Sequence, residues 1–346
     1  MSQTATSDPT IGQDTERLNE LAFSFKKSQA LAAALQVDLF SALAAGAGSV
    51  QEVAARCGIP LEAADRLLVI CRAMHLVRSV DGRFENFDDV NRYLVRDSRT
   101  FFGDYLRFTI GAEYDEWSHF PDNLAQASDA PPPSKLYEGD LEDPQRAREF
   151  TQAGYNSSIA LAHRLAKRFD FSRFHKWLDF AGGSGCYAIA ACERHPGLRV
   201  QVKDHRNVIP VTREFIASHK LQDRIDAQPG DFLRQQDYPD DCDLISFITP
   251  LHWYLKPDVT KALGYAWQAL PSGGTVLVLG YMLNDDRDGP LDAAYYHLQA
   301  IRGGHFTGHV PSGPEYVTYL HEAGFVDGHY QWFLSGRLGL VTARKP

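Results

Sequence analysis

Several features are scarce in this 346-residue sequence, and each scarcity excludes a class of protein. Its five cysteines show no CxxC spacing, so we expect reduced, mostly buried thiols rather than a disulfide framework. No apolar run approaches the ~18 residues that a membrane span needs. The first residues, MSQTATSDPTIGQDTE, resemble neither a secretory nor an import signal. We therefore expect a cytoplasmic protein with a disordered N-terminus over residues 1–16.

Positive charge is also scarce. Lys and Arg number 35 against 44 Asp and Glu, which gives a net charge of −9, and no basic cluster stands out. A nucleic-acid partner is therefore not expected, because phosphate contacts need such clusters. The apolar content of 44% is typical of a soluble globular protein, and the length predicts two domains.

The N-terminal part has the pattern of a winged helix over residues 17–100. Apolar residues from Leu18 to Leu43 recur at helical spacing, as one helix or two. Ser49 and Glu52 form the sequence of a capping box that begins a helix ending at Gly58, and a further helix follows Pro60. The segment VRSVDGRFENF then predicts a hairpin.

A winged helix can bind DNA or hold two subunits together. In the second helix of the motif, Arg66 and Arg72 are balanced by Glu62 and Asp65. This charge balance favours dimerisation, and it disfavours the alternative of a DNA-binding regulator.

Residues 101–170 are expected to form a helical connector and substrate lid. Seven aromatic residues lie between Phe101 and Phe120, and their spacing fits either a buried core or a lid. A helix over residues 143–169 follows the three prolines and carries Tyr155 and Asn156.

From Trp177 onward, strand-like and helix-like segments alternate, which predicts an α/β domain with a parallel sheet over residues 171–346. The last two strand-like runs are joined by Ser335 and Gly336, so they should pair as a hairpin. A Rossmann-like parallel sheet ending in an antiparallel hairpin is typical of methyltransferases that use S-adenosylmethionine (SAM).

Motifs at three successive strand ends support that interpretation. The first strand runs into the glycine-rich turn Asp179–Gly185, where a Cβ would block a ligand from approaching the backbone. Asp204 ends the second strand and is placed to accept hydrogen bonds from ribose hydroxyls. After the third strand, Asp231 and Phe232 offer an acid and an aromatic wall for an adenine.

These motifs make the chain resemble the class I methyltransferases of the caffeate and acetylserotonin O-methyltransferase type. LDFAGGSG, VKDHRNVI, GDF, LPSGG and EAGF all match the family in register, from about residue 18 to the end. The resemblance implies a homodimer joined by the N-terminal domain, SAM as cofactor, S-adenosylhomocysteine (SAH) as product, and no metal. It implies these cofactor-binding residues: Asp179, Gly182, Gly183, Gly185, Asp204, Asp231, Phe232 and Thr249.

Catalysis in the family uses a histidine after the fourth strand, supported by an acid at the end of the fifth. His252 matches the histidine, whereas Tyr281 lies in the segment where the acid is expected, and these two are the expected catalytic residues. One hypothesis is O-methylation of a phenolic or polyketide-like hydroxyl with His252 as general base.

The missing acid favours a second hypothesis, because a thioether sulfur has no proton to lose. Proximity, orientation and water exclusion would then supply most of the rate, and rings near the methyl group would favour the sulfonium product. The chain resembles a bacterial branch of the family that S-methylates 4-methylthio-2-hydroxybutyrate on the route to dimethylsulfoniopropionate (DMSP). Arg302, expected on a helix in the pocket wall, can pair with a carboxylate. The expected substrate-binding residues are Tyr155, Asn156, Trp253, Tyr295, Tyr296, Gln299 and Arg302.

His305 and His309 are spaced four apart, as some metal ligands are. Glycines surround them and predict a loop, and no third ligand is evident in the sequence. No metal site is therefore expected.

Overall fold

The computed structural model describes residues 15–130 and 139–346. Almost all of the expected disordered segment 1–16, and the centre of the expected lid, lie outside the described residues. The chain divides into two compact units, residues 1–114 and 115–346, and each is described here by itself.

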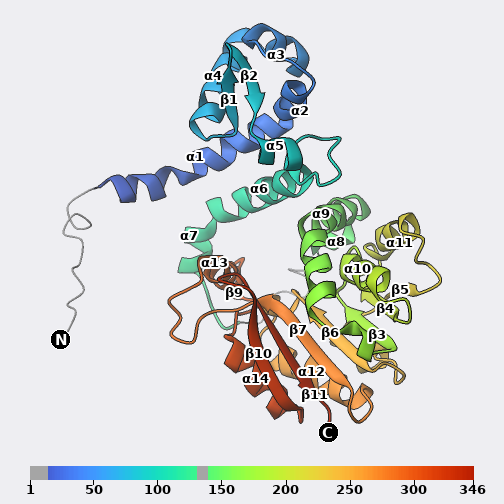
Figure 1. Cartoon of the computed structure of the whole chain (residues 1–346). Coiled ribbons are helices and arrows are strands. Elements are labelled where there is room, and N and C mark those ends of the chain that lie inside the picture. Colours follow the sequence, from blue (N-terminus) through green and yellow to red (C-terminus); the bar gives the residue numbers. More distant parts are fainter. Residues whose placement is uncertain (1–14, 131–138) are drawn as a thin grey trace, which may run out of the picture. The chain divides into compact units, whose positions relative to one another are not determined.

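The first unit combines short helices with one hairpin (Figure 1). Its elements are α1 (Glu16–Gln36), α2 (Leu39–Ala44), α3 (Val50–Cys57), α4 (Leu61–Ala73), β1 (Val77–Val80), β2 (Arg83–Asn86), α5 (Asp88–Tyr93) and most of α6 (Gly103–Ser118). The first apolar stretch forms two helices, because Asp38 adopts a left-handed conformation (φ 56°) between them. The unit is not all-helical, because β1 and β2 pair antiparallel through the predicted turn.

The predicted capping box at the start of α3 is confirmed. The Ser49 hydroxyl accepts the Glu52 N–H at 3.2 Å, and the Glu52 carboxylate accepts the Ser49 N–H at 2.9 Å. Gly58 ends the helix with a φ of 66°, which favours glycine. The unit's core packs around Leu39, Phe40 and Leu68.

The aromatic residues between Phe101 and Phe120 do not form the buried core that was one of the two expectations. Phe120 is buried and Tyr114 is exposed, while the other five are half-buried. Their helices, α6 and α7 (Phe120–Ala125), expose part of each ring, so sequence spacing alone overestimated their burial.

The second unit contains the predicted mixed sheet (Figure 1). Its helices, besides α7, are α8 (Gly139–Glu142), α9 (Pro144–Arg168), α10 (Cys186–Arg194), α11 (Ile209–Ser218), α12 (Lys256–Ala269), α13 (Leu291–Gln299) and α14 (Gly313–Glu322). Three 3-10 turns, η1 (Phe171–Arg173), η2 (Gln235–Asp237) and η3 (Leu251–Trp253), join them. Its strands are β3 (Lys176–Phe180), β4 (Arg199–Asp204), β5 (Ile225–Pro229), β6 (Leu244–Ile248), β7 (Thr275–Tyr281), β8 (Ile301–Arg302), β9 (His305–Phe306), β10 (Val326–Leu334) and β11 (Leu338–Arg344).

The seven-stranded sheet has the order β10-β11-β7-β6-β3-β4-β5. The strands β3 to β7 run parallel, and β11 joins β7 and β10 antiparallel. The predicted parallel sheet with a terminal hairpin is thus confirmed. The carboxyl ends of β3, β4, β5 and β6 meet at one edge, where ligands bind in such sheets.

Two apolar layers cover the sheet faces. One contains Trp177 and Ile189 and lies under α9 and α10, and the other contains Phe180 and Leu263 and lies under α12 and α14. The buried β6 is apolar except for Ser246, as expected for a strand covered on both faces. All five cysteines are free thiols, and four of them are buried. No helix within residues 15–130 and 139–346 is long and apolar enough to cross a membrane.

Candidate cofactor and methyl-acceptor site

The turn after β3 is built on glycines that side-chain-bearing residues could not replace. A Cβ on Gly182 would lie 2.7 Å from the Asp179 Oδ2 and from Val202, and Gly183 and Gly185 have φ angles of 55° and 73°. These positions therefore need glycine. Gly185 precedes the first turn of α10, so the N–H groups of that turn face the same edge of the sheet.

Asp179 is a fully buried carboxylate at the end of β3. Its Oδ1 accepts the Ser246 hydroxyl at 2.5 Å, and Ser246 in turn accepts the Trp177 Nε1–H at 2.8 Å. Its Oδ2 is buried without a hydrogen-bond partner. Burial raises the pKa of Asp179 to about 7. An unpartnered buried oxygen beside a glycine turn is suited to a cationic ligand group.

Asp204, at the end of β4, fixes the glycine turn from the opposite side. Its Oδ2 accepts the Gly183 N–H at 2.7 Å, and its Oδ1 accepts the His205 N–H at 2.6 Å. Burial raises the pKa of Asp204, although these backbone donors favour its charged form. The carboxylate is thereby held rigidly at the edge of the sheet.

Asp231 and Phe232 lie on the loop after β5, as predicted. The Asp231 Oδ1 accepts the Leu233 N–H at 2.8 Å, and the buried Phe232 ring meets the Tyr254 ring edge-to-face at 4.9 Å. Thr249 follows β6 with a φ of 67°, and its N–H donates to the Leu279 carbonyl at 2.7 Å. The strand ends thus offer carboxylates, backbone groups and one aromatic wall together.

This set of groups fits SAM. The orphaned Asp179 oxygen suits its ammonium group, the open side of Gly183, where an added Cβ would meet nothing within 4 Å, admits a nucleoside, and Asp204 and Asp231 suit its ribose and adenine. The chemistry of the donor set therefore agrees with the motif-based prediction.

The predicted catalytic histidine is buried in a cluster of aromatic rings. His252 lies on η3 after β6, is 3% exposed, and its Nε2 is buried without a hydrogen-bond partner among the described residues. Burial lowers the pKa of His252 to about 3, so its imidazole is neutral throughout the physiological range.

Three of the predicted residues surround that imidazole. The ring centroids of Trp253, Tyr296 and Tyr281 lie 4.7, 5.0 and 5.4 Å from that of His252. Tyr281 and Tyr296 stack on each other at 3.9 Å, with 29° between their planes. At the end of β7, where the family's acid is expected, the Tyr281 ring therefore contacts His252 edge-to-face.

A charged group that the sequence did not reveal lies beside this cluster. Glu116, on α6, accepts the Arg302 Nε–H at 2.9 Å and the Gln299 side-chain amide at 3.4 Å, and the Arg302 guanidinium lies 5.9 Å from the Trp253 ring centroid. Arg302 is on β8 rather than on a helix, because α13 ends at Gln299 and the chain turns at Gly303 and Gly304, both with positive φ. His305 belongs to the paired strand β9, so its segment is not the expected loop.

The remaining predicted substrate residues have other neighbours. Tyr155 stacks on Phe215 at 4.1 Å and shares a 2.8 Å hydrogen bond with His219, which ties α9 to α11. Tyr295 is 50% exposed, and its ring meets Trp117 edge-to-face at 6.3 Å. Asn156 is half-buried on α9.

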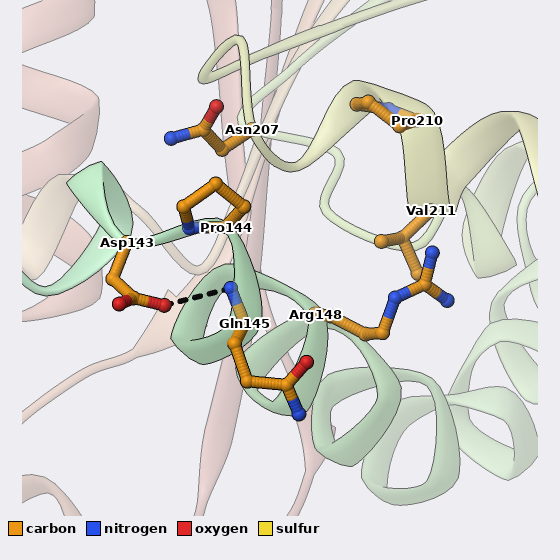
Figure 2. Close-up of a pocket in the computed structure, with 7 residues that line it drawn as sticks. All are labelled: Asp143, Pro144, Gln145, Arg148, Asn207, Pro210 and Val211. Atoms are coloured by element: carbon orange, nitrogen blue, oxygen red, sulfur yellow. Dashed lines mark hydrogen bonds between the residues drawn. The ribbon is translucent and has the colours of Figure 1, made fainter.

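Two cavities lie close to the candidate site. One of about 430 Å³ lies between the first turn of α9 and the start of α11, where Figure 2 shows Asn207 and Pro210 facing Pro144 and Arg148. Its lining includes Asn207, which is three residues after Asp204 along the chain. The other cavity, of about 680 Å³, is lined by Leu255, Leu298, Phe306 and their neighbours, directly beyond η3.

The fold and the site together define a SAM-dependent methyltransferase. The chain belongs to the O-methyltransferase family: residues 126–326 match the O-methyltransferase domain, and residues 19–96 match the O-methyltransferase dimerisation domain. The family-level prediction and the cofactor prediction are thereby confirmed.

Individual relatives extend over nearly the whole chain. The 3-hydroxy-5-methyl-1-naphthoate 3-O-methyltransferase of Streptomyces sahachiroi is 32% identical over 95% of this chain and 94% of its own. The L-tyrosine C(3)-methyltransferase of Streptomyces lavendulae is 28% identical over 90% and 87%. The crystal structure of human N-acetylserotonin methyltransferase in complex with SAM has a TM-score of 0.85 at 25% identity, over 99% of both chains. The relatives' names include transfer to oxygen and to carbon, so family membership leaves the acceptor atom open.

Proposed function

We propose that this methyltransferase acts on a nucleophile that has no proton to lose, namely the thioether sulfur of a small carboxylic acid. The observation that carries the proposal is the burial of His252 among aromatic rings, where its Nε2 has no hydrogen-bond partner among the described residues. Burial lowers the pKa of His252 to about 3, far below the pKa of a phenol, which is about 10, so the imidazole is a poor acceptor for a phenolic proton. A thioether requires no such transfer.

The rings around His252 suit the cationic product of such a transfer. A cation over an aromatic face gains roughly 0.5–2 kcal/mol. The rings of Trp253, Tyr281 and Tyr296 all pack against His252, so a sulfonium bound beside this cluster would lie near aromatic rings. When bound, SAM supplies an electrophilic methyl group on a sulfonium. The residues of this chain orient the acceptor sulfur in line, exclude water and stabilise a positive charge that passes from one sulfur to another.

The Arg302 guanidinium beside the aromatic rings leads us to propose that the acceptor carries a carboxylate. Arg302 lies within 5.9 Å of Trp253, and the buried Gln299 adds an amide donor. A short thioether acid can reach the rings and the guanidinium together. The best candidate is 4-methylthio-2-hydroxybutyrate, the acceptor of the S-methylating branch that the chain resembles, with His252 available to hydrogen-bond its 2-hydroxyl group.

O-methylation is the second candidate, and two observations favour it. The relative from Streptomyces sahachiroi is named as an O-methyltransferase, and the buried His252 Nε2 has no hydrogen-bond partner among the described residues. A hydroxyl acidic enough to ionise before it binds would not need a strong base.

One measurement separates these candidates. Transfer to a hydroxyl releases one proton per turnover, whereas transfer to a thioether releases none. The enzyme should be incubated with SAM and a panel of thioether acids and phenols, with products identified by mass spectrometry and proton release followed in weak buffer. A methylsulfonium product without proton release supports the first proposal. A methyl ether with stoichiometric release, and no sulfonium, overturns it in favour of the second.

We also propose that the chain is a homodimer joined by its N-terminal unit. The match of residues 19–96 to a dimerisation domain supports this, as do exposed apolar side chains on α1 and α4, including Leu21, Phe25 and Val69. Sedimentation equilibrium should give twice the chain mass, and a monomer at micromolar concentration would contradict it.

A further inference from the structure

We propose that Lys203 is a positioning residue for the adenine half of the cofactor. Lys203 is the last residue of β4 before Asp204 and is 8% exposed. Lys203 is not among the cofactor-binding residues that the sequence motifs predicted. It nevertheless contacts both the glycine turn and the loop after β5.

The side chain of Lys203 supports the loop that follows β5. Its Nζ donates to the Asp237 carbonyl at 2.5 Å. Its stem lies under Gly230, where an added Cβ would come within 2.7 Å of the Lys203 Cδ. The backbone of the loop therefore rests on the methylene groups, while the ammonium holds the far end of the loop.

Asp237 connects Lys203 to Asp231, one of the two residues predicted to contact the adenine. Its Oδ2 accepts the Asp231 N–H at 2.9 Å. Tyr238 donates its hydroxyl to the Phe232 carbonyl at 2.7 Å, which closes the loop on itself. Because Lys203 and Asp231 bind the same residue, the ammonium fixes the position of the carboxylate that faces the adenine.

The backbone of the same dipeptide binds the other cofactor segments. The Lys203 carbonyl accepts the Ala181 N–H at 2.7 Å, and the Asp204 carbonyl accepts the Gly230 N–H at 3.0 Å. With the bond from Gly183 to Asp204, the dipeptide joins the glycine turn, the ribose carboxylate and the adenine loop. A hydrophobic side chain of the same length would fill the space but would leave Asp237 unheld, and burying an ammonium costs desolvation free energy that a purely structural position does not need.

The test uses the full-length enzyme, and its cofactor-binding measurements do not depend on which acceptor is methylated. Lys203→Met keeps the stem and removes the ammonium, and Lys203→Arg restores a donor. Lys261→Met, at an exposed position on α12, is the matched control. Calorimetry with SAH and with adenosine should show a Kd about tenfold higher for Lys203→Met, near wild type for Lys261→Met, and within about threefold of wild type for Lys203→Arg. The KM for SAM should rise while the KM for the acceptor stays within about twofold.

A second variant keeps the proposal falsifiable if Lys203→Met folds poorly. Asp237→Ala keeps the carbonyl that binds Lys203 and removes the carboxylate that holds Asp231, so it should weaken SAH and adenosine binding similarly. An unchanged Kd in either folded variant overturns the proposal. Equal losses in the KM values for SAM and acceptor also overturn it, because they indicate a general structural defect.

Discussion

The Tyr281 ring stacks on the Tyr296 ring at 3.9 Å, and the two rings belong to different elements, the end of β7 and the middle of α13. His252 meets the pair edge-on from η3. Three segments far apart in the sequence thus form one ring-lined site, in which charge can develop away from water.

Replacing one ring of this pair should lower activity sharply. Tyr296→Leu removes a stacking and a cation–π partner, and together these are worth about 1–3 kcal/mol. We expect kcat to fall roughly tenfold or more for a thioether acceptor, in steady-state assays at saturating SAM. Tyr295→Leu, one residue earlier and half exposed, is the control and should stay near wild type. A change confined to KM would indicate that the ring only binds an aromatic acceptor.

His252→Ala distinguishes a packing histidine from a general base. For transfer to sulfur we expect a loss of less than about tenfold, because no proton moves. Loss of a true general base costs about 10²–10⁴-fold. The exposed His329→Ala is the control, and SAH binding should survive in both variants. A loss of a thousandfold with intact SAH binding would establish base catalysis.

Asp179 should make stability and cofactor affinity depend on pH in opposite directions. Its pKa is about 7 in the folded protein and about 3.9 when unfolded, so between these values the folded state holds more protons and stability falls as pH rises. The full effect is about 4 kcal/mol, present below pH 4 and lost through about pH 7.

An ammonium group prefers the ionised Asp179, so the affinity for SAH should rise between pH 6 and 8. Calorimetry and melting curves across this range, with Asp179→Asn as comparison, measure both trends. If the two proteins show identical pH dependence, the assignment of Asp179 is wrong.

Glu116 should compete with an acidic acceptor for Arg302. Glu116→Gln keeps the shape of the side chain but removes the charge that pairs with the guanidinium at 2.9 Å. The KM for a thioether carboxylate should fall several-fold, while the KM for the matching neutral amide should not change. A rise in the KM for the acid would show that Glu116 helps to bind the acceptor.

Much of the fold was predictable because it depends on local chemistry. The capping box of Ser49 and Glu52 was predictable because it is defined by a spacing of three residues along the sequence. The glycines near Asp179 are constrained by backbone angles and by close approach to their neighbours. The burial of the α6 aromatic residues was not predictable. Helical spacing shows which side chains share one face of a helix, but it does not show whether another element packs on that face.

The methyl-acceptor part of the site was likewise predictable only in part. The sequence indicated that His252 lacks an acid partner, because a tyrosine occupies the end of β7. It did not indicate that Glu116 lies on Arg302, 186 residues away, or that Tyr155 turns to Phe215 and His219. Neither contact leaves a pattern along the chain.

The amino-acid sequence by itself determined the parallel sheet with its terminal hairpin, the glycine turn and the carboxylates that follow β3, β4 and β5, because parallel strands place their carboxyl ends at one edge. Only the tertiary structure decided the protonation state and the neighbours of the side chains in the candidate site. Burial sets the pKa values of His252 and Asp179, and the packing of α6, α13 and η3 selects which side chains meet. Both depend on contacts between residues that are distant in sequence.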